Sequence, residues 1–488
     1  MSIIFLTLFR FVDLYLEHSL FFSKFNQPAM SPFTPTSKEE LKLAVQQIDY
    51  STGVHGTHGH VNTWDVSNVT DMSWMFDGCS SFNQPLDNWD VSNVTDMCEM
   101  FAGCSSFNQP LDNWNVGNVG NVTDMSRMFS GCSSFNQPLN WNVSNVTDMS
   151  GMFDGCSSFD KPLDWNVSNV TNMSGMFGEC SSFDKPLNWN VSNVTDMSGM
   201  FAGCSSFNQP LDNWDVSNVT DLSLMFFRCP SFNQPLDNWD VSNVTDMTGM
   251  FARCSSFNQP LDNWNVGNVT DMTAMFSGCS SFDKPLDWNV SNVTTMSGMF
   301  AECSSFDKPL DWNVSNVTYM SLMFAECSSF NQPLDNWDVS NVTDMSEMFA
   351  GCSSFNQPLS SWNVGNVTKT TGMFKNCDAL FPSNLNQGLV KEYYKTKWHH
   401  HPTFTTSRSR KRIRQEIKEL QDEEMALRQR IDVLMQEQAS HIILQTIRTH
   451  IPAMREWSGR PPLVLGDFDP GSHDFRTAET RWNKRCRR

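Results

Sequence analysis

Apolar residues recur along this chain in a fixed order. The cysteine of each copy marks the period, which is 24 or 25 residues with a single interval of 28. In one unit the apolar residues are Val69, Met72, Met75, Phe76, Cys79, Phe82, Leu86, Trp89, Val91 and Val94. One unit cannot close a core alone, but stacked copies cover one another. The pattern therefore predicts a solenoid of thirteen units over residues 64–390.

Each unit is predicted to hold one short helix. Met72, Met75 and Phe76 fall at i, i+3 and i+4, which places them on one helix face. Thr70 is a candidate cap, with its hydroxyl accepting a backbone N–H, and Gly78 can end the helix in the left-handed conformation.

Each unit is also predicted to hold one short strand. Trp89 and Val91 alternate with polar residues, which is typical of a strand with one buried face. Stacking brings such strands together in a parallel sheet, about 4.8 Å apart. Large side chains should then form buried ladders, represented by Trp89, Trp114, Trp214, Trp239, Cys104, Cys204, Cys254, Phe101, Phe201 and Phe251.

The unit resembles the 25-residue BspA-like repeat of mycoplasma lipoproteins and protist surface proteins. The match rests on residues 68–76, 78–82 and 85–86 and on their equivalents in the other copies. The skeleton of residues 86–94 is also similar to a leucine-rich-repeat strand in which tryptophan and valine replace leucines. The resemblance implies a leucine-rich-repeat-like solenoid, usually displayed at a cell surface, and it supplies no catalytic residue to carry over.

Two segments precede the array. Residues 1–35 form a leader whose apolar run is interrupted by Arg10, Asp13 and Glu17, so we favour an amphipathic or disordered leader over a signal peptide or anchor. Residues 36–63 are predicted to form an N-terminal helical cap that begins with a capping box at Ser37. Its apolar cover is expected from Leu41, Leu43, Ala44 and Val45.

After the array we expect a linker over 391–406, an α-helix over 407–450 and a basic, disordered tail over 451–488. The apolar spacing of this helix fits both a weak homodimeric coiled coil and a single helix packed on the array. The seam consists of Ile413, Ile417, Leu420, Leu427, Ile431 and Leu434. The basic run 408–414 is similar to that of a basic leucine zipper, but the residues that read bases in that family are missing, which disfavours nucleic-acid binding.

Charge divides the chain in two. Residues 1–390 carry 13 Lys and Arg against 40 Asp and Glu, whereas residues 391–488 carry 20 against 13. The acidic array should repel nucleic acid and anionic membranes, and it could attract cations or basic partners.

Thirteen of the 15 cysteines occupy one position of the unit. The Cβ vectors of equivalent residues in stacked units run parallel, which suits a disulfide poorly. We therefore predict a ladder of buried free thiols that pack as small apolar groups.

Several repeated residues could carry chemistry, and for each we favour a structural interpretation. The Asn-Val-Thr sequon that begins at Asn68 recurs along the array, where a turn explains the asparagine without glycosylation. The aspartate row that begins at Asp71 could bind calcium, but a helix start also favours a carboxylate. The histidines in 55–60 and 399–401 are expected to be solvated loop residues.

Two irregularities interrupt the copies. A duplicated Gly-Asn-Val within 116–122 is expected to bulge as a loop. Four units read Asp-Lys in place of Asn-Gln and are one residue shorter, which should tighten a bend without changing the core.

The sequence contains no recognisable phosphate-binding glycine loop, catalytic triad, metal motif or cofactor motif. We expect a non-enzymatic repeat protein, without a cofactor, that offers an extended surface to a protein or glycan ligand. The alternatives are a structural coat protein without a specific ligand and a nucleic-acid binder that acts through the tail. No transmembrane span is predicted.

Overall fold

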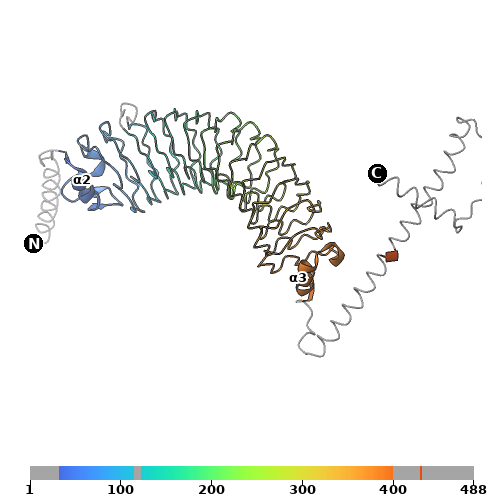
Figure 1. The fold of residues 1–488 in the computed structure, drawn as a ribbon. Coiled ribbons are helices and arrows are strands. Elements are labelled where there is room, and N and C mark those ends of the chain that lie inside the picture. The colour runs from blue at the N-terminus through green and yellow to red at the C-terminus, as the bar shows by residue number, and fades with distance from the viewer. Residues whose placement is uncertain (1–31, 115–121, 399–428, 431–488) are drawn as a thin grey trace, which may run out of the picture. The chain divides into compact units, whose positions relative to one another are not determined.

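A computed structural model describes residues 32–114, 122–398 and 429–430 (Figure 1). The chain divides into two compact units, Met1–His399 and His400–Arg488. Several predictions concern residues outside the described ranges. They are those for the leader up to residue 31, the loop residues 115–121, the histidines 399–401, the six seam residues and the tail from 451.

The N-terminal cap begins with helix α2 (Lys38–Val45), where the sequence predicts a helix. Ser37 is its N-cap, and its hydroxyl accepts the backbone N–H of Glu40 at 3.2 Å. The Glu40 carboxylate accepts the backbone N–H of Thr36 at 2.9 Å, one residue before the position that a standard capping box uses.

Helix α2 covers the first coil with only part of its predicted apolar set. Leu41, Ala44 and Val45 are buried, but the prediction for Leu43 is wrong: its side chain is 59% exposed, on the outer helix face. A small antiparallel sheet and a 3-10 helix complete the cap. They are β1 (Ile48–Asp49), β2 (Val54–His55), β3 (Gly59–His60) and η1 (Val61–Thr63).

The repeats form stacked coils that are joined by a parallel ladder of backbone bridges (Figure 1). One residue of each coil bridges its equivalent in the next coil, from the pair Asp71 and Asp96 to the pair Asp344 and Lys369. Backbone groups that a single coil leaves unpaired are thereby satisfied by its neighbours. The solenoid expected from the repeat is present.

The short helix predicted in each unit is not formed. The N–H of Trp74 donates to the carbonyl of Cys98 in the next coil at 2.9 Å instead of bonding back along the chain. Trp74 also has φ +55°, a left-handed conformation that a helix does not accommodate. Gly78 is left-handed as predicted, at φ +72°. The i, i+3, i+4 spacing reflects consecutive turns whose apolar side chains point inward.

The threonine ahead of these turns has a different role from the predicted helix cap. The hydroxyl of Thr95 donates to the carbonyl of Thr70 in the preceding coil at 3.1 Å. The bond recurs in later coils, as from Thr245 to Thr220 at 3.2 Å. The threonine therefore ties one coil to another.

The predicted strand around Trp89 is also wrong in position. The N–H of Trp89 closes a turn on the carbonyl of Leu86 at 3.0 Å, and that of Val94 closes another on Val91 at 3.0 Å. In the described coils the repeated parallel bridges run through the row of Asp71 instead, and one further bridge joins Leu359 to Leu385 at the end of the array. The side chains of Trp89 and Val91 are nevertheless buried, as the alternation predicts.

Equivalent aromatic rings of neighbouring coils lie farther apart than the general spacing of strands in a ladder. Neighbouring strands lie about 4.8 Å apart in a ladder. Equivalent rings are 5.7 Å apart at Phe177 and Phe201, and 6.3 Å apart at Trp165 and Trp189. Figure 1 shows the stacked coils as a curved array.

The array ends with 3-10 helix η2 (Pro382–Asn384) and helix α3 (Gln387–Trp398). Leu389 and Tyr393 of α3 are buried, and the Tyr393 hydroxyl donates to the carbonyl of Leu380 at 2.9 Å. The linker predicted from 391 is therefore wrong over 391–398, where the chain remains helical and packs on the last coil.

Candidate interaction surface

The predicted tryptophan ladder lies inside the array. Trp89, Trp114, Trp214 and Trp239 are 2–3% exposed. The indole Nε1 of Trp89 donates to the carbonyl of Val61 in the cap, and each of the other three donates to a backbone carbonyl of the preceding coil, as from Trp114 to Leu86 at 2.8 Å. Sequence reasoning missed this bond. It explains why tryptophan fills a position that leucine could otherwise occupy, since leucine has no donor.

Phenylalanines form a second buried ladder, and Phe101, Phe201 and Phe251 are fully buried in it. Each ring lies nearly parallel to its equivalent in the next coil. The centroids of Phe201 and Phe226 are 5.8 Å apart with the planes 5° from parallel, and Phe226 and Phe251 are 5.7 Å apart. The result is a continuous aromatic stack along the core.

The cysteine ladder consists of free thiols, and Cys104, Cys204 and Cys254 are fully buried. The Sγ of Cys204 donates to the carbonyl of Phe177 in the preceding coil at 2.9 Å, and the bond recurs along the array. Burial raises the pKa of the Cys254 thiol to about 12. These thiols therefore stay protonated at neutral pH and act as donors.

The sequon residues hold coils together. The Nδ2 of Asn243 donates to the carbonyl of Ser217 in the preceding coil at 2.7 Å. Equivalent bonds of 2.6–2.9 Å recur from Asn93 to Asn366. The asparagine amide therefore has a structural partner, in keeping with the interpretation that we favour.

The Asn-Gln and Asp-Lys pairs of the repeat both make contact with the equivalent pair of the neighbouring coil, but through different chemical groups. The Oδ1 of Asn208 accepts the backbone N–H of Asn233 at 2.9 Å and the Nε2 of Gln234 at 3.1 Å. Where two Asp-Lys units adjoin, the Nζ of Lys185 lies 2.7 Å from Oδ2 of Asp160, and one further pair has the same geometry. An ion pair thus replaces the amide contact in adjoining Asp-Lys units.

The predicted aspartate row is the bridge row itself. The Oδ1 of Asp221 accepts the N–H of Ser223 at 2.8 Å, and similar bonds recur along the row. The carboxylate thus stabilises a turn and not the helix start that we predicted. At one end of the row, Lys369 lies 3.1 Å from Asp344. The part of the chain that the structure describes holds no group of three or more side chains suited to a metal ion.

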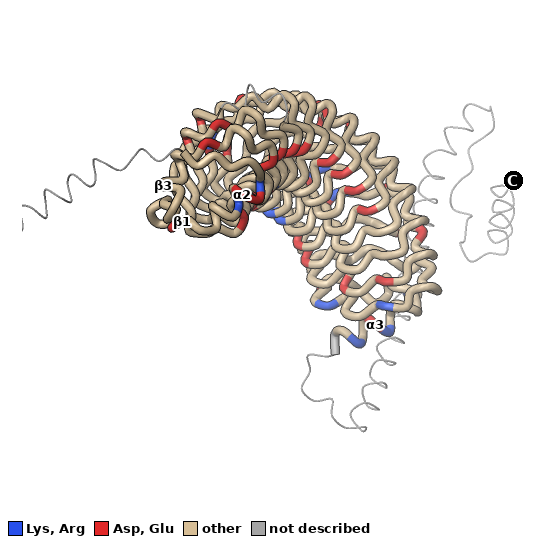
Figure 2. The backbone as a smooth tube through the Cα atoms, turned by 90° about the vertical axis from the view of Figure 1, so that its left-hand side faces the viewer, with Lys and Arg blue, Asp and Glu red and all other residues tan. Residues whose placement is uncertain are grey.

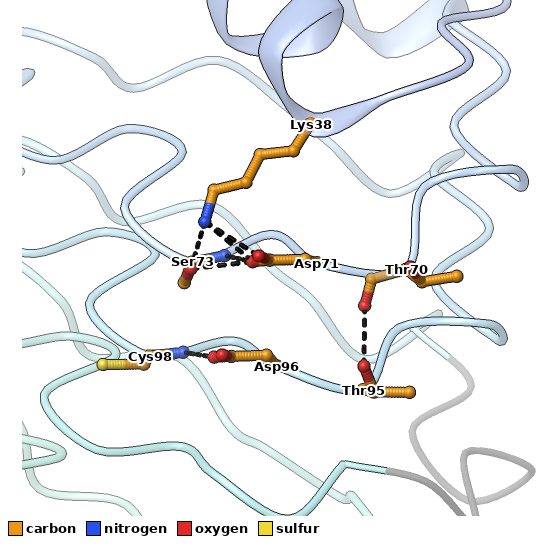
Figure 3. A network of polar contacts seen from close by, with 7 residues as sticks. All are labelled: Lys38, Thr70, Asp71, Ser73, Thr95, Asp96 and Cys98. Atoms are coloured by element: carbon orange, nitrogen blue, oxygen red, sulfur yellow. Dashed lines mark hydrogen bonds and ion pairs between the residues drawn. The ribbon is translucent and has the colours of Figure 1, made fainter.

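At the other end, helix α2 supplies a lysine to the row. Lys38 forms an ion pair with Asp71 at 2.9 Å and donates to the hydroxyl of Ser73 (Figure 3). Its Nζ also lies 4.7 Å from the ring centroid of Trp74. Burial raises the pKa of Asp71, but the contacts with Ser73 and Lys38 outweigh it and leave the pKa below its ordinary value.

The histidines of the cap are not the solvated residues that we predicted. His55 is 5% exposed, its ring stacks on His58 at 4.2 Å, and His58 stacks on Phe33 at 3.9 Å. The Nδ1 of His55 accepts the N–H of Thr57, so its Nε2 carries the proton toward Gln47 in the neutral ring. Burial lowers the pKa of His55.

Four positions of the unit differ most from coil to coil, and their burial differs as well, from buried alanine and glycine to exposed larger side chains. They are the positions of Asp71, Trp74, Asp77 and Gly78, and we call the surface that they form along the array the variable face. Among the copies of the repeat in the sequence, the position of Trp74 holds six residue types, whereas the position of Asn68 is asparagine in all of them. Acidic residues form rows across the coils (Figure 2).

Stacked coils with copied polar contacts define a repeat solenoid. The sequence matches the family described as "Mycoplasma protein of unknown function, DUF285" over residues 48–139, 118–188, 187–287 and 286–387. These matches cover more than half of the chain, and the protein belongs to this family. The resemblance to the BspA-like mycoplasma repeat is thereby confirmed.

Two solved structures of leucine-rich-repeat proteins are similar at low identity. A leucine-rich cell surface protein of Faecalibacterium prausnitzii is 15% identical, with 59% of this chain and 82% of that chain covered and a TM-score of 0.31. A leucine-rich repeat protein of Bacteroides ovatus is 15% identical, with coverage of 62% and 87% and a TM-score of 0.26. No curated protein matches the chain. Within the described ranges, no helix has the length and apolar character needed to cross a membrane.

Proposed function

We propose that this protein is a non-enzymatic scaffold at a cell surface that binds a protein or glycan ligand along an extended face. The observation that carries the proposal is that the polar groups fall into two sets, those that bond to a neighbouring coil and those that remain exposed. Copied side chains bond to the neighbouring coil, as Asn243 and Gln234 do. Among the described residues, no buried side-chain nitrogen or oxygen lacks a partner. The groups that remain for a ligand are the exposed ones, and of these the variable face differs most between coils.

The location at a cell surface is supported by the family, whose BspA-like repeats occur in surface lipoproteins. Two finer features belong to the same proposal. The array consists of thirteen units, which set the length of the surface, and the helix expected over 407–450 joins two copies weakly. Sedimentation of the full chain against a chain that ends at residue 398 tests the second feature, because only the longer chain should dimerise.

Labelled full-length protein on glycan and protein arrays tests the binding function. The expected result is saturable binding to one ligand class, which disappears when the protein is unfolded in urea. Protease treatment of intact cells, followed by mass spectrometry, tests the location, since peptides of the array should be released. Release of peptides without any ligand on either array would favour the coat protein, and protection of the array in intact cells would contradict the surface location.

A further inference from the structure

Bulky side chains of the variable face occupy backbone positions that favour glycine. The positions of Trp74 and Gly78 are left-handed in every described coil, with φ between +52° and +77°. Residues other than glycine are disfavoured there. Leu224 nevertheless lies between two coils that have Gly199 and Gly249 at the same position. The coil itself does not require leucine at this place.

Burial does not compensate for this conformation. Leu224 and Leu322 are each 43% exposed, and Tyr319, in the same coil as Leu322, is 51% exposed. Leu224 lies toward the next coil, where a Cβ at Gly249 would be 2.9 Å from its Cδ2. Trp74 differs from these residues because Lys38 of the cap lies over its ring. The two leucines have no comparable explanation within the described contacts.

The exposed apolar residues form two groups on the variable face. Leu224 and the half-buried Phe227 make the first group, and Tyr319 and Leu322 make the second. Four coil steps separate the groups, or about 19 Å at the ladder spacing. The three coils between them present only small residues at the leucine position, Gly249, Ala274 and Gly298. An extended chain advances about 3.3 Å per residue, so about six residues span this distance.

Acidic residues outnumber basic ones between and beside the two groups. In these five coils the variable face carries five carboxylates and two guanidinium groups. Asp246 and Asp271 lie in the coils between the groups, and each uses Oδ1 for its own turn. Neither makes an ion pair within the described residues. A segment with positive charge between its apolar residues complements this arrangement.

We propose that the variable face between Asp221 and Glu326 binds an extended segment of a partner protein. This segment has two apolar side chains six positions apart, with lysine or arginine between them. The inference rests on the proposed binding function and narrows it to a protein ligand and to one part of the array. An extended segment places positions i, i+2, i+4 and i+6 on one side. The intermediate basic residues thus face the aspartates while the apolar ends contact the two groups.

Selection of a phage-displayed library of random 12-residue peptides on the full chain provides the test. The expected binders have apolar residues at i and i+6 and basic residues between them, and their binding weakens with salt. The best synthetic peptide is then titrated by fluorescence anisotropy. Combining Leu224→Gly with Leu322→Gly should weaken peptide binding about tenfold or more, since each substitution removes an apolar contact with the peptide. The absence of binders, or an unchanged affinity, would overturn the inference.

Residues that occur at the same positions in other coils supply both the test variants and the control variant. Glycine already occupies the leucine position in several coils, so the two substitutions should leave the melting temperature unchanged or higher. The control variant, Asn233→Asp with Gln234→Lys, introduces the residue pair of the Asp-Lys units. Both substitutions lie outside the variable face and should leave peptide binding unchanged. If the arrays reveal a ligand that the double leucine variant binds normally, the binding function stands and this inference fails. If no ligand binds in either experiment, both fail.

Discussion

The indole Nε1 of Trp239 lies 2.9 Å from the carbonyl oxygen of Leu211, one coil back. The same carbonyl accepts the backbone N–H of Trp214 at 3.1 Å. One acceptor therefore closes a turn of its own coil and binds the next coil. Cys204 repeats this arrangement in the cysteine ladder, because the carbonyl of Phe177 accepts both its thiol and the backbone N–H of Cys180.

Substitutions of Trp239 should separate the packing of the ring from its hydrogen bond. Trp239→Ala removes both and should lower the free energy of unfolding by about 3–5 kcal/mol. Trp239→Phe keeps an aromatic ring but removes the donor, and we expect a loss of about 1–3 kcal/mol. Urea denaturation followed by circular dichroism measures both. Equal stability of the Phe variant and the native chain would show that the indole bond contributes nothing.

Thiol labelling should distinguish two half-buried cysteines, Cys79 at the start of the ladder and Cys98 outside it, from the buried remainder of the ladder. Burial raises the pKa of all three thiols of Cys79, Cys98 and Cys104, but Cys79 and Cys98 are only half-buried, whereas Cys104 and the later cysteines of the ladder are buried. Brief iodoacetamide treatment of native protein at pH 8 should modify Cys79 and Cys98 well before the buried remainder of the ladder. Peptide mass spectrometry gives the order, and treatment in urea supplies the fully labelled control. Fast native labelling of Cys204 would contradict the buried ladder.

The Asp-Lys contact should depend on its acceptor more than on its charge. Lys308 lies 2.7 Å from Asp283, with both side chains about one-third exposed, so Lys308→Gln should change stability by less than about 1 kcal/mol. Asp283→Lys instead removes the acceptor of the Asp307 N–H and places two lysines together. We expect it to lower the melting temperature, least at high salt. Asp283→Asn introduces the residue that other coils have at this position. It is the control and should leave the melting temperature nearly unchanged.

Acid should weaken the N-terminal cap through His55. Burial lowers its pKa below the ordinary value of 6.5, so the unfolded chain binds more protons below that pH. The stability that this residue contributes is present above about pH 6.5 and is lost as the pH falls below it. Melting curves at pH 7.5 and 5.5 should show a larger decrease for the native chain than for His55→Gln. An equal decrease in both would assign the effect to other groups.

The helix prediction failed for a local reason. Met72, Met75 and Phe76 have the spacing of a helix face, but the same spacing arises when two turns direct these side chains inward. Other copies of the repeat contained sequence evidence against a helix. Six units have glycine at the position of Trp74, in the middle of the predicted helix. Glycine at that frequency favours a left-handed residue over a continuous helix.

The sequence predicted the residues of the core better than the residues of the candidate surface. Copied residues such as Asn68 attract attention because they recur, yet in later coils their amides hold neighbouring backbone. The residues that differ from coil to coil, such as Leu224, look like noise in a repeat alignment. The exposure of Leu224 and its left-handed backbone, on which the proposal of a binding role rests, are properties of the folded chain.

The sequence by itself determined the unit length, the stacking of units and the side chains that face the core. It did so because apolar residues must leave water and a unit of this size cannot bury them alone. Only the tertiary structure decided which backbone segment forms the ladder and what the tryptophan and cysteine donors contact. The acceptor of each such group, as with Trp239 and Leu211, lies about a full unit away along the chain. A local pattern carries no information about that pairing until the coils are stacked.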